Sequence, residues 1–185
     1  MKSRIFLIAI LLIFATSAAA QGYEIKRASD GPFSFSISGI KINEGSSLTR
    51  ESILFNDPSA PVELKSHSTQ IIYKDRGFRF SGSTELDAKQ PIVAIQVRTI
   101  LYDVFGQHMK NLANTEPKDF SPGTANITGE WRAFDNDITR MLTTVTYVAR
   151  VRLADGTQWV FDADNLQLAL SGLNLEQKIG ETDEE

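Results

Sequence analysis

The chain contains no cysteine among its 185 residues. Disulfide bonds, thiol catalysis, thiolate metal sites and a lipid-modified N-terminal cysteine are therefore excluded. Without disulfides the fold must be held by its hydrophobic core, for which about 165 residues in one domain are sufficient. The sequence also lacks a G-x-S-x-G elbow, an H-E-x-x-H pair, a P-loop and a dinucleotide fingerprint. It therefore offers no established catalytic or cofactor-binding motif.

Positive charge is scarce as well. The chain has 19 Lys and Arg against 23 Asp and Glu, a formal net charge of −4 at pH 7. Loss of Lys2 and Arg4 with an N-terminal signal would leave 17 basic residues and a net charge near −6. Binding of nucleic acid requires clustered Lys and Arg to neutralise phosphates, so we expect no nucleic-acid partner.

Long apolar runs are confined to the N-terminus, "MKSRIFLIAILLIFATSAAAQG". Two basic residues precede an apolar run from Ile5 to Ala15, and small residues end at Ala18-Ala19-Ala20. These are the three parts of a secretory signal peptide, and the apolar run is shorter than the roughly twenty residues that cross a bilayer. We therefore expect residues 1–20 to be removed, and the chain from about Gln21 to be periplasmic or secreted with no transmembrane segment.

Strand patterns separated by turn signals dominate the remainder. "FSFSISGIKI" alternates from Phe33 to Ile42 with a change of phase at Gly39, which indicates a bulge or bend. Asp75-Arg76-Gly77 and Asp155-Gly156 each separate two apolar alternating runs, which predicts two tight hairpins. About seven strands with short turns predict an all-β sandwich. In the second hairpin we place one set of side chains on a single face, namely Val145, Tyr147, Ala149, Val151 and Leu153.

"PIVAIQVRTILYDVF" is the longest apolar run after the signal peptide and predicts a central strand. Val93, Ile95, Val97 and Leu101 share its first face. Its second face begins with Gln96 and Arg98 and becomes apolar at Ile100 and Tyr102. We therefore expect this strand to be solvated on one side at first and covered on both sides later.

Helix is predicted in two short places. Asp135 to Leu142 has an Asp cap and apolar spacing for one or two turns. Residues 163–175 are ambiguous, because their leucines fit either a short helix capped by Asp162 or Asp164, or a strand. We divide the chain into the signal peptide, an N-terminal strand and linker at 21–60, the sandwich domain at 61–175 and a disordered acidic tail at 176–185.

"TILYD" followed by Gly106 resembles the FxLYD family of exported bacterial domains. Leu101, Tyr102, Asp103 and Gly106 match the family pattern, and Pro122-Gly123 stands where its later turn is expected. Thr99 replaces the phenylalanine of that pattern, and the resemblance covers about residues 78–134. It implies an immunoglobulin-like β-sandwich without established catalytic residues, and we expect no cofactor.

Asp103 could be an acid or a metal ligand, but Asp followed three residues later by Gly is the signature of a type I turn. Tyr102 then reads as a half-buried strand residue rather than a nucleophile, and Pro122-Gly123 as a type II turn. His67 and His108 could contribute to a zinc site, although their spacing does not indicate one. We interpret both histidines as residues beside loops.

Two oxygen-rich segments, Asp135–Asp137 and Asp162–Asp164, could bind calcium, but neither matches an EF-hand loop, and helix capping explains them more simply. Trp131 and Trp159 could form a sugar-stacking platform, although a tryptophan on an alternating strand more often packs between sheets. We therefore expect an exported, non-enzymatic module that binds another envelope or secreted protein through a sheet face or an open edge. The alternatives are a carbohydrate-binding module and a hydrolase that uses clustered Asp residues.

Overall fold

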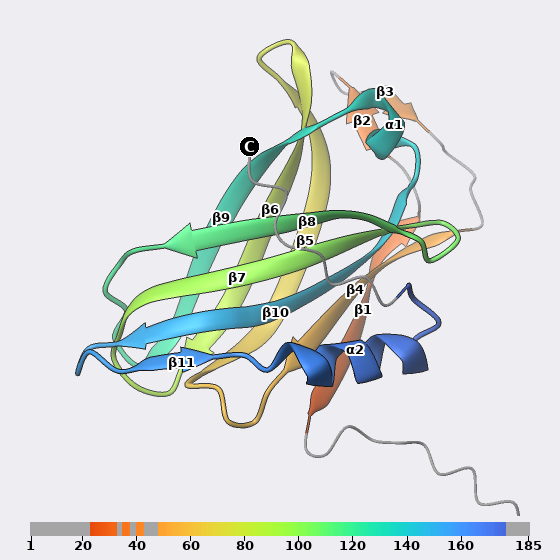
Figure 1. Cartoon of the computed structure of the whole chain (residues 1–185). Coiled ribbons are helices and arrows are strands. Elements are labelled where there is room, and N and C mark those ends of the chain that lie inside the picture. Colours follow the sequence, from red (N-terminus) through yellow and green to blue (C-terminus); the bar gives the residue numbers. More distant parts are fainter. Residues whose placement is uncertain (1–22, 33–34, 38–39, 43–47, 177–185) are drawn as a thin grey trace, which may run out of the picture.

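The computed structural model describes residues 23–32, 35–37, 40–42 and 48–176 (Figure 1). The expected signal peptide and residues 177–185 of the expected tail lie outside these ranges. Within them, no helix is long and apolar enough to cross a membrane.

Nine strands of the described chain form two sheets, so the all-β prediction is confirmed while the expected number of about seven is too low. Neighbouring strands are antiparallel, except that β4 and β10 pair in parallel. The six-stranded sheet has the order β1 (Glu24–Pro32), β4 (Thr49–Asn56), β10 (Met141–Leu153), β7 (Ile92–Asp103) and β8 (His108–Glu116), and β11 (Gln158–Val160) also pairs with β10. The three-stranded sheet has the order β5 (Val62–Lys74), β6 (Gly77–Ala88) and β9 (Gly123–Ala133).

A separate hairpin of β2 (Phe35–Ile37) and β3 (Ile40–Ile42) replaces the single bent strand that was expected around Gly39. Phe35 pairs with Ile42 in antiparallel register, so the chain reverses between the two strands. Ser38 and Gly39 lie outside the described residues. Two residues are enough for a β-hairpin connection, so a change of phase at a glycine is compatible with a tight turn as well as with a bulge.

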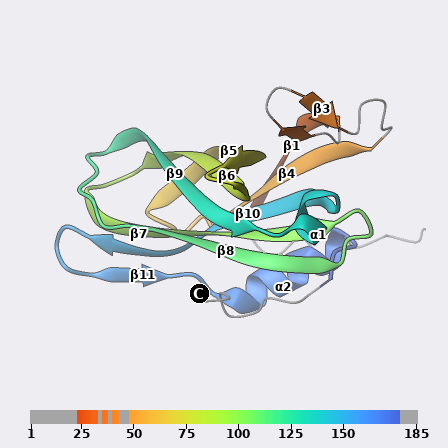
Figure 2. The same cartoon turned by 90° about the horizontal axis from the view of Figure 1, so that it is seen from above.

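The molecule has three layers, with the six-stranded sheet between the three-stranded sheet and α2 (Ala163–Gly172) (Figure 2). Leucine, isoleucine and valine side chains such as Leu54, Leu86 and Ile95 fill the space between the two sheets. On the other face, Leu166 and Leu170 of α2 pack in a cluster with Phe55, Tyr102 and Tyr147. Residues 163–172 are therefore helix, the first of the two alternatives. Asp162 is its cap, accepting a hydrogen bond from the Asp164 amide at 3.1 Å.

The outer face of β7 changes along the strand as the sequence predicts. Gln96 and Arg98 are half-buried, whereas Ile100 and Tyr102 are buried and belong to the cluster that α2 covers. This confirms that β7 is covered on one side at first and on both sides later.

The faces of β10 differ from the prediction because the strand contains a bulge. Val148 pairs with Val97 and Arg150 with Gln96, which leaves Ala149 as an extra residue. A bulge shifts the alternation by one position. As a result Tyr147 and Ala149 belong to the cluster beneath α2, whereas Val151 packs between the sheets.

The N-terminal segment lies within the sandwich, and this corrects the boundary expected at residue 60. The side chains of β4 reach β5, the outer strand of the second sheet. Ser52 Oγ donates to the His67 carbonyl at 2.8 Å. Asn56 donates to the Leu64 carbonyl at 3.0 Å and accepts from the Leu64 amide at 2.8 Å. These bonds satisfy backbone groups that an open strand edge would expose.

The hairpin turns predicted at Asp75-Arg76 and Asp155-Gly156 are formed, whereas α1 (Asp135–Ile138) differs from the prediction. This helix is a single turn whose cap is Phe134 rather than an aspartate, and the Asp137 carboxylate accepts from the Phe134 amide at 3.1 Å. Gly123, after Pro122, has a φ of 119° and begins β9. Asp155 and Gly156 join β10 to β11 as expected, with the Thr157 amide donating to the Asp155 carboxylate at 2.8 Å.

Candidate functional site

Asp103 holds the β7–β8 turn, as the sequence predicts. One carboxylate oxygen, Oδ1, accepts hydrogen bonds from the amides of Phe105 and Gln107, both at 2.9 Å. The other oxygen lies 2.6 Å from Arg140 Nη2, an ion pair that the sequence did not predict. Burial raises the pKa of this carboxyl, but the hydrogen bonds from Arg140 and from the two amides outweigh burial and hold the pKa below its usual value.

The same turn binds the end of the described chain. The Tyr102 hydroxyl donates to the Glu176 carbonyl at 3.2 Å, and the Glu176 amide donates to the Gly106 carbonyl at 2.9 Å. The His108 amide donates to the Glu176 carboxylate at 2.8 Å. Tyr102 is thus completely buried rather than half-buried, and burial raises its pKa. Glu176, expected at the start of a disordered tail, is instead fixed to the turn.

Gly106 is required here by its conformation and by its surroundings. Its φ is 75°, in the left-handed region that favours glycine. A Cβ atom at this position would also lie 2.9 Å from the Asn174 carbonyl oxygen. Gly106 therefore allows residues 174–176 to approach the turn closely. The matching residues of the FxLYD pattern have a structural role in this chain, with Leu101 completely buried in the core.

The two histidines have separate hydrogen-bond partners. His67 is buried, and its ring nitrogens lie 2.8 Å from the hydroxyls of Thr84 and Thr69. Burial lowers the pKa of His67 to about 4. His108 Nε2 lies 2.9 Å from the Asn111 amide oxygen. Among the residues that the structure describes, no group of three or more His, Asp or Glu side chains could hold a metal ion.

Both tryptophans are half-buried and contribute to packing. Trp131 Nε1 donates to the Ala113 carbonyl at 2.9 Å, so its indole connects β9 to β8. The Trp131 ring lies over Gly129, where a Cβ atom would be 2.5 Å from it, and close to Gly82. Trp159 packs against both apolar clusters of the six-stranded sheet and donates to Ser59 Oγ at 3.2 Å.

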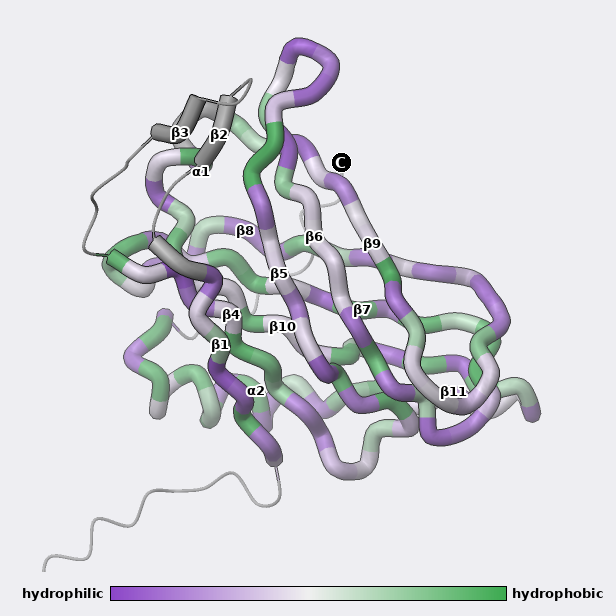
Figure 3. The backbone as a smooth tube through the Cα atoms, turned by 180° about the vertical axis from the view of Figure 1, so that it is seen from behind, coloured by the Kyte–Doolittle hydropathy of each residue, from purple (hydrophilic) through white to green (hydrophobic). Residues whose placement is uncertain are grey.

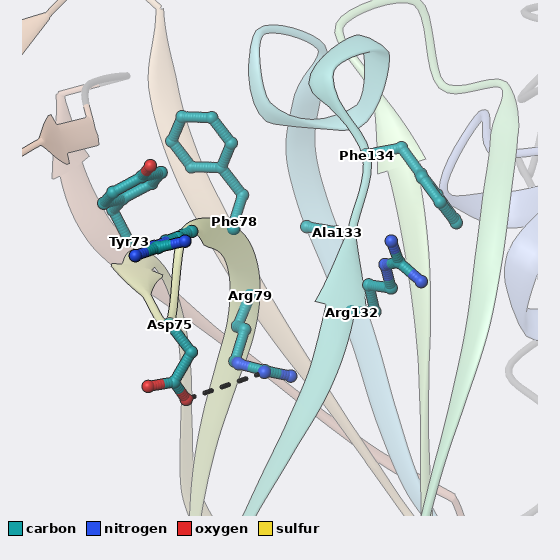
Figure 4. Close-up of a pocket in the computed structure, with 9 residues that line it drawn as sticks. Tyr73, Asp75, Phe78, Arg79, Arg132, Ala133 and Phe134 are labelled. Carbon is teal, nitrogen blue, oxygen red and sulfur yellow. Dashed lines mark ion pairs between the residues drawn. The ribbon is translucent and has the colours of Figure 1, made fainter.

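A hollow of about 940 Å³ lies beside the tip of the β5–β6 hairpin, and we call it the hairpin hollow. The hairpin projects beyond the two sheets (Figures 1 and 3). The hollow is lined by residues 73 and 75–79 of the hairpin and by residues 132–134 at the end of β9. Figure 4 shows Tyr73 and Phe78 on the hairpin side and Arg132 and Phe134 on the β9 side.

Aromatic rings supply the apolar part of the hairpin hollow. Tyr73 and Phe134 are each 47% exposed. Tyr73 packs edge-on against Phe78, with ring centroids 5.2 Å apart. Cations lie over the Phe134 ring, with Lys110 Nζ 5.0 Å and the Arg132 guanidinium 5.5 Å from its centroid. Such contacts hold cationic groups beside an apolar surface.

Positive charge predominates in the hairpin hollow, with three arginines and one aspartate in its lining. Arg79 and Asp75 form an ion pair of 3.8 Å, which leaves Arg76 and Arg132 in excess. The Nε atom of Arg79 is buried and has no hydrogen-bond partner among the described residues. The hollow therefore offers several donors to an anionic group, in a protein whose overall charge is negative.

The hairpin tip has an unusual backbone for its residues. Asp75 and Arg76 have φ angles of 52° and 61°. A two-residue hairpin with both residues left-handed favours Asn or Asp followed by Gly. Arginine at the second position carries a conformational cost of about 1–2 kcal/mol.

The sequence predicts the β5–β6 hairpin but not the hollow beside it. "YKDRGF" concentrates aromatic and charged residues at a turn, and this pattern is the one sequence signal that indicates a binding surface at the hairpin tip. The other half of the hollow comes from β9, and Arg132 lies directly opposite Arg79 in the pairing of β6 with β9. That register depends on contacts between strands far apart in the sequence.

Comparisons with known proteins identify no family. No protein-family model matches the sequence, and no curated protein matches it. A solved X-ray structure of a hypothetical protein from Peptoclostridium difficile 630 is similar over 61% of this chain and 92% of that chain, with 12% identity and a TM-score of 0.42. This likeness assigns neither a family nor an activity to the chain.

Proposed function

We propose that this protein is a non-catalytic, exported binding module, and that it recognises an acidic segment of an envelope or secreted protein in the hairpin hollow. The observation that carries the proposal is the gathering of Arg76, Arg79 and Arg132 with three aromatic rings in one concave surface. The export of the protein rests on the signal-peptide pattern of residues 1–20.

The chemistry of the hollow supports an acidic partner. Arginine binds carboxylates through paired hydrogen bonds, and aromatic rings add apolar contact at low entropic cost. Tyrosine, phenylalanine and arginine are the residues enriched at protein interfaces. The hollow combines both kinds of contact, since Tyr73 and Phe134 are partly exposed beside the guanidinium groups of Arg76 and Arg132, which exceed the single aspartate of the lining.

Kinship with immunoglobulin-like FxLYD domains is part of the same proposal. Leu101 to Asp103 end a core strand and Gly106 closes its turn, as a fold-marking motif would. A fold alone does not define an activity, so the binding function rests on the hollow rather than on this kinship.

A carbohydrate-binding module is the alternative. The rings of Tyr73 and Phe134 could stack on sugars, but a neutral glycan would leave the excess arginines without partners. Both tryptophans donate their N–H groups within the protein. The observations therefore favour an anionic peptide segment.

The proposal can be tested by capture of the partner with matched variants. Purified tagged chain would be incubated with envelope and secreted fractions and mildly crosslinked. We expect a partner retained by the wild type and lost with Arg132→Glu, because charge reversal repels an acidic segment. Arg150→Glu is the control, since Arg150 is an exposed strand arginine on β10, outside the hollow.

Synthetic probes then identify the class of ligand. A labelled Glu- and Asp-rich peptide should bind the wild type, and binding should fall at least tenfold with Arg132→Glu and with raised salt. Equal binding by the Arg132 and Arg150 variants would overturn the proposal. Binding of neutral cell-wall glycans but not of the acidic peptide would replace it with the carbohydrate alternative.

A further inference from the structure

The C-terminal segment of this chain begins close to the hairpin hollow. Glu176 is bound to the β7–β8 turn, where its carboxylate accepts from the His108 amide at 2.8 Å. Lys110 follows two residues later along β8, about 7 Å of extended strand. Its ammonium lies 5.0 Å from the centre of the Phe134 ring, which lines the hollow. Glu176 and the hollow are thus separated only by the short segment of β8 from His108 to Lys110 and by the Phe134 ring.

The length of the remaining segment is sufficient for it to reach the hollow. Residues 177–185 lie beyond Glu176, and nine extended residues span at most about 30 Å. The first acidic residue after Glu176 is Glu181, which is five positions away along the chain, or at most about 18 Å. Because Glu176 is held by its amide, carbonyl and carboxylate, the segment leaves from a fixed point.

The charge of the segment complements that of the hollow. Residues 177–185 contain Lys178 and four acidic residues, Glu181, Asp183, Glu184 and Glu185. The hollow has Arg76 and Arg132 in excess, with Lys110 beside Phe134 and only Asp75 opposing them. The acidic end therefore has the same chemistry as the partner segment proposed above.

We infer that residues 181–185 occupy the hairpin hollow and compete there with the acidic segment of the partner. The inference rests on the proposed function, and it adds an internal competitor to the site. A tethered segment acts at an effective concentration in the millimolar range. Even a contact with a dissociation constant of about 0.1 mM would then weaken a partner's binding roughly tenfold.

The test uses the full chain with a neutralised segment. Glu181→Gln, Asp183→Asn, Glu184→Gln and Glu185→Gln are combined in one variant, and Thr182→Ala serves as the charge-preserving control. The probe is a labelled synthetic peptide, GETDEE, which copies residues 180–185. Fluorescence anisotropy should show that the peptide binds the neutralised variant about tenfold more tightly than it binds the wild type or the control.

A second substitution tests whether the peptide binds in the hollow. Adding Arg132→Glu to the neutralised variant should abolish binding of the peptide, whereas adding Arg150→Glu should leave it unchanged. Equal affinity for the wild type and the neutralised variant, or no binding to the neutralised variant, would overturn the competition. The capture experiment remains separate, because failure to capture any partner that depends on Arg132 would overturn the proposed function and leave the measured competition standing.

Discussion

Asp103 and Arg140 form an ion pair of 2.6 Å that joins the β7–β8 turn to the residue just before β10. The two partners differ in exposure, since the Asp103 side chain is completely buried and that of Arg140 is 53% exposed. Asp103 also accepts hydrogen bonds from two backbone amides of its own turn, so both oxygens of its carboxylate have partners within the protein. The residue that resembles a catalytic acid in the sequence is thus a structural anchor.

Replacement of Asp103 should be costly. Asp103→Ala leaves two turn amides without their acceptor and Arg140 without its partner, so we expect unfolding free energy to fall by about 3 kcal/mol. Arg140→Ala should lower the unfolding free energy by about 1 kcal/mol, because the Arg140 side chain is half-exposed and the two hydrogen bonds from the turn amides remain. Urea unfolding at pH 7 measures both values. A loss no larger for Asp103→Ala than for Arg140→Ala would contradict this role.

Gly106 should be more sensitive to substitution than another left-handed glycine. Gly106 and Gly156 have φ angles of 75° and 88°, but a Cβ at Gly106 would meet the Asn174 carbonyl at 2.9 Å while one at Gly156 meets nothing within 4 Å. Gly156→Ala should therefore cost about 1 kcal/mol from backbone strain alone. Gly106→Ala should cost at least about 1 kcal/mol more, with faster hydrogen exchange at the Glu176 amide. Equal losses would show that the contact with Asn174 is unimportant.

Acid should weaken the fold through His67. Its pKa is about 4 in the folded protein and about 6.5 when unfolded, so the unfolded state takes up the proton first. The neutral imidazole contributes its full stability above about pH 6.5, and this is lost as the pH falls towards 4. Between pH 7 and pH 5 we expect a loss of about 2 kcal/mol. Glu63, whose pKa is lowered from 4.5 to about 2 by Lys65 and Lys26, stabilises the fold above about pH 4.5 and loses this contribution only below that pH.

His67→Gln provides the control for that titration. Glutamine keeps a donor and an acceptor for Thr84 and Thr69 but does not titrate, so the difference between pH 7 and pH 5 should largely disappear. An NMR titration of the His67 ring in the wild type measures its pKa directly. A ring that becomes protonated near pH 6.5 in the folded protein would contradict this prediction.

Arg76 should show opposite effects on stability and binding. Arg76→Gly relieves a left-handed φ of 61° and should raise the unfolding free energy by about 1 kcal/mol. Because it removes a guanidinium from the hairpin hollow, it should also weaken binding of an acidic peptide. Arg76→Ala retains most of the backbone strain, so it should weaken binding without the gain in stability. Urea unfolding and fluorescence anisotropy separate the two effects, and unchanged peptide binding by both variants would remove Arg76 from the site.

The features that the sequence predicts correctly are local. Asp75 and Arg76 form the hairpin turn, and Asp103 and Gly106 the β7–β8 turn, because each turn depends on a few adjacent residues. The alternating faces of β7 follow from the same short-range pattern, including the point where Ile100 begins to be covered. Each of these predictions depends only on the residue pattern within a single strand or a single turn.

The features that it does not predict depend on distant partners. The bulge at Ala149 is defined by the register of β10 against β7. The hairpin hollow requires Arg79 and Arg132 to lie side by side, a like-charge pair that no pairing rule favours. Arg140, which binds Asp103, lies 37 positions from it along the chain. Spacing within a segment contains no information about such partners.

The parallel pairing of β4 with β10 also limits when the protein can fold. Thr143 to Tyr147 pair with Glu51 to Phe55, which lie 92 positions earlier in the chain. Such a distant contact is slow to form, because the intervening chain must first be ordered or closed into a loop. The six-stranded sheet therefore cannot be completed until β10 has been synthesised. Until then the nascent chain lacks the central strand of this sheet, and β4 and β7 have no strand between them to pair with.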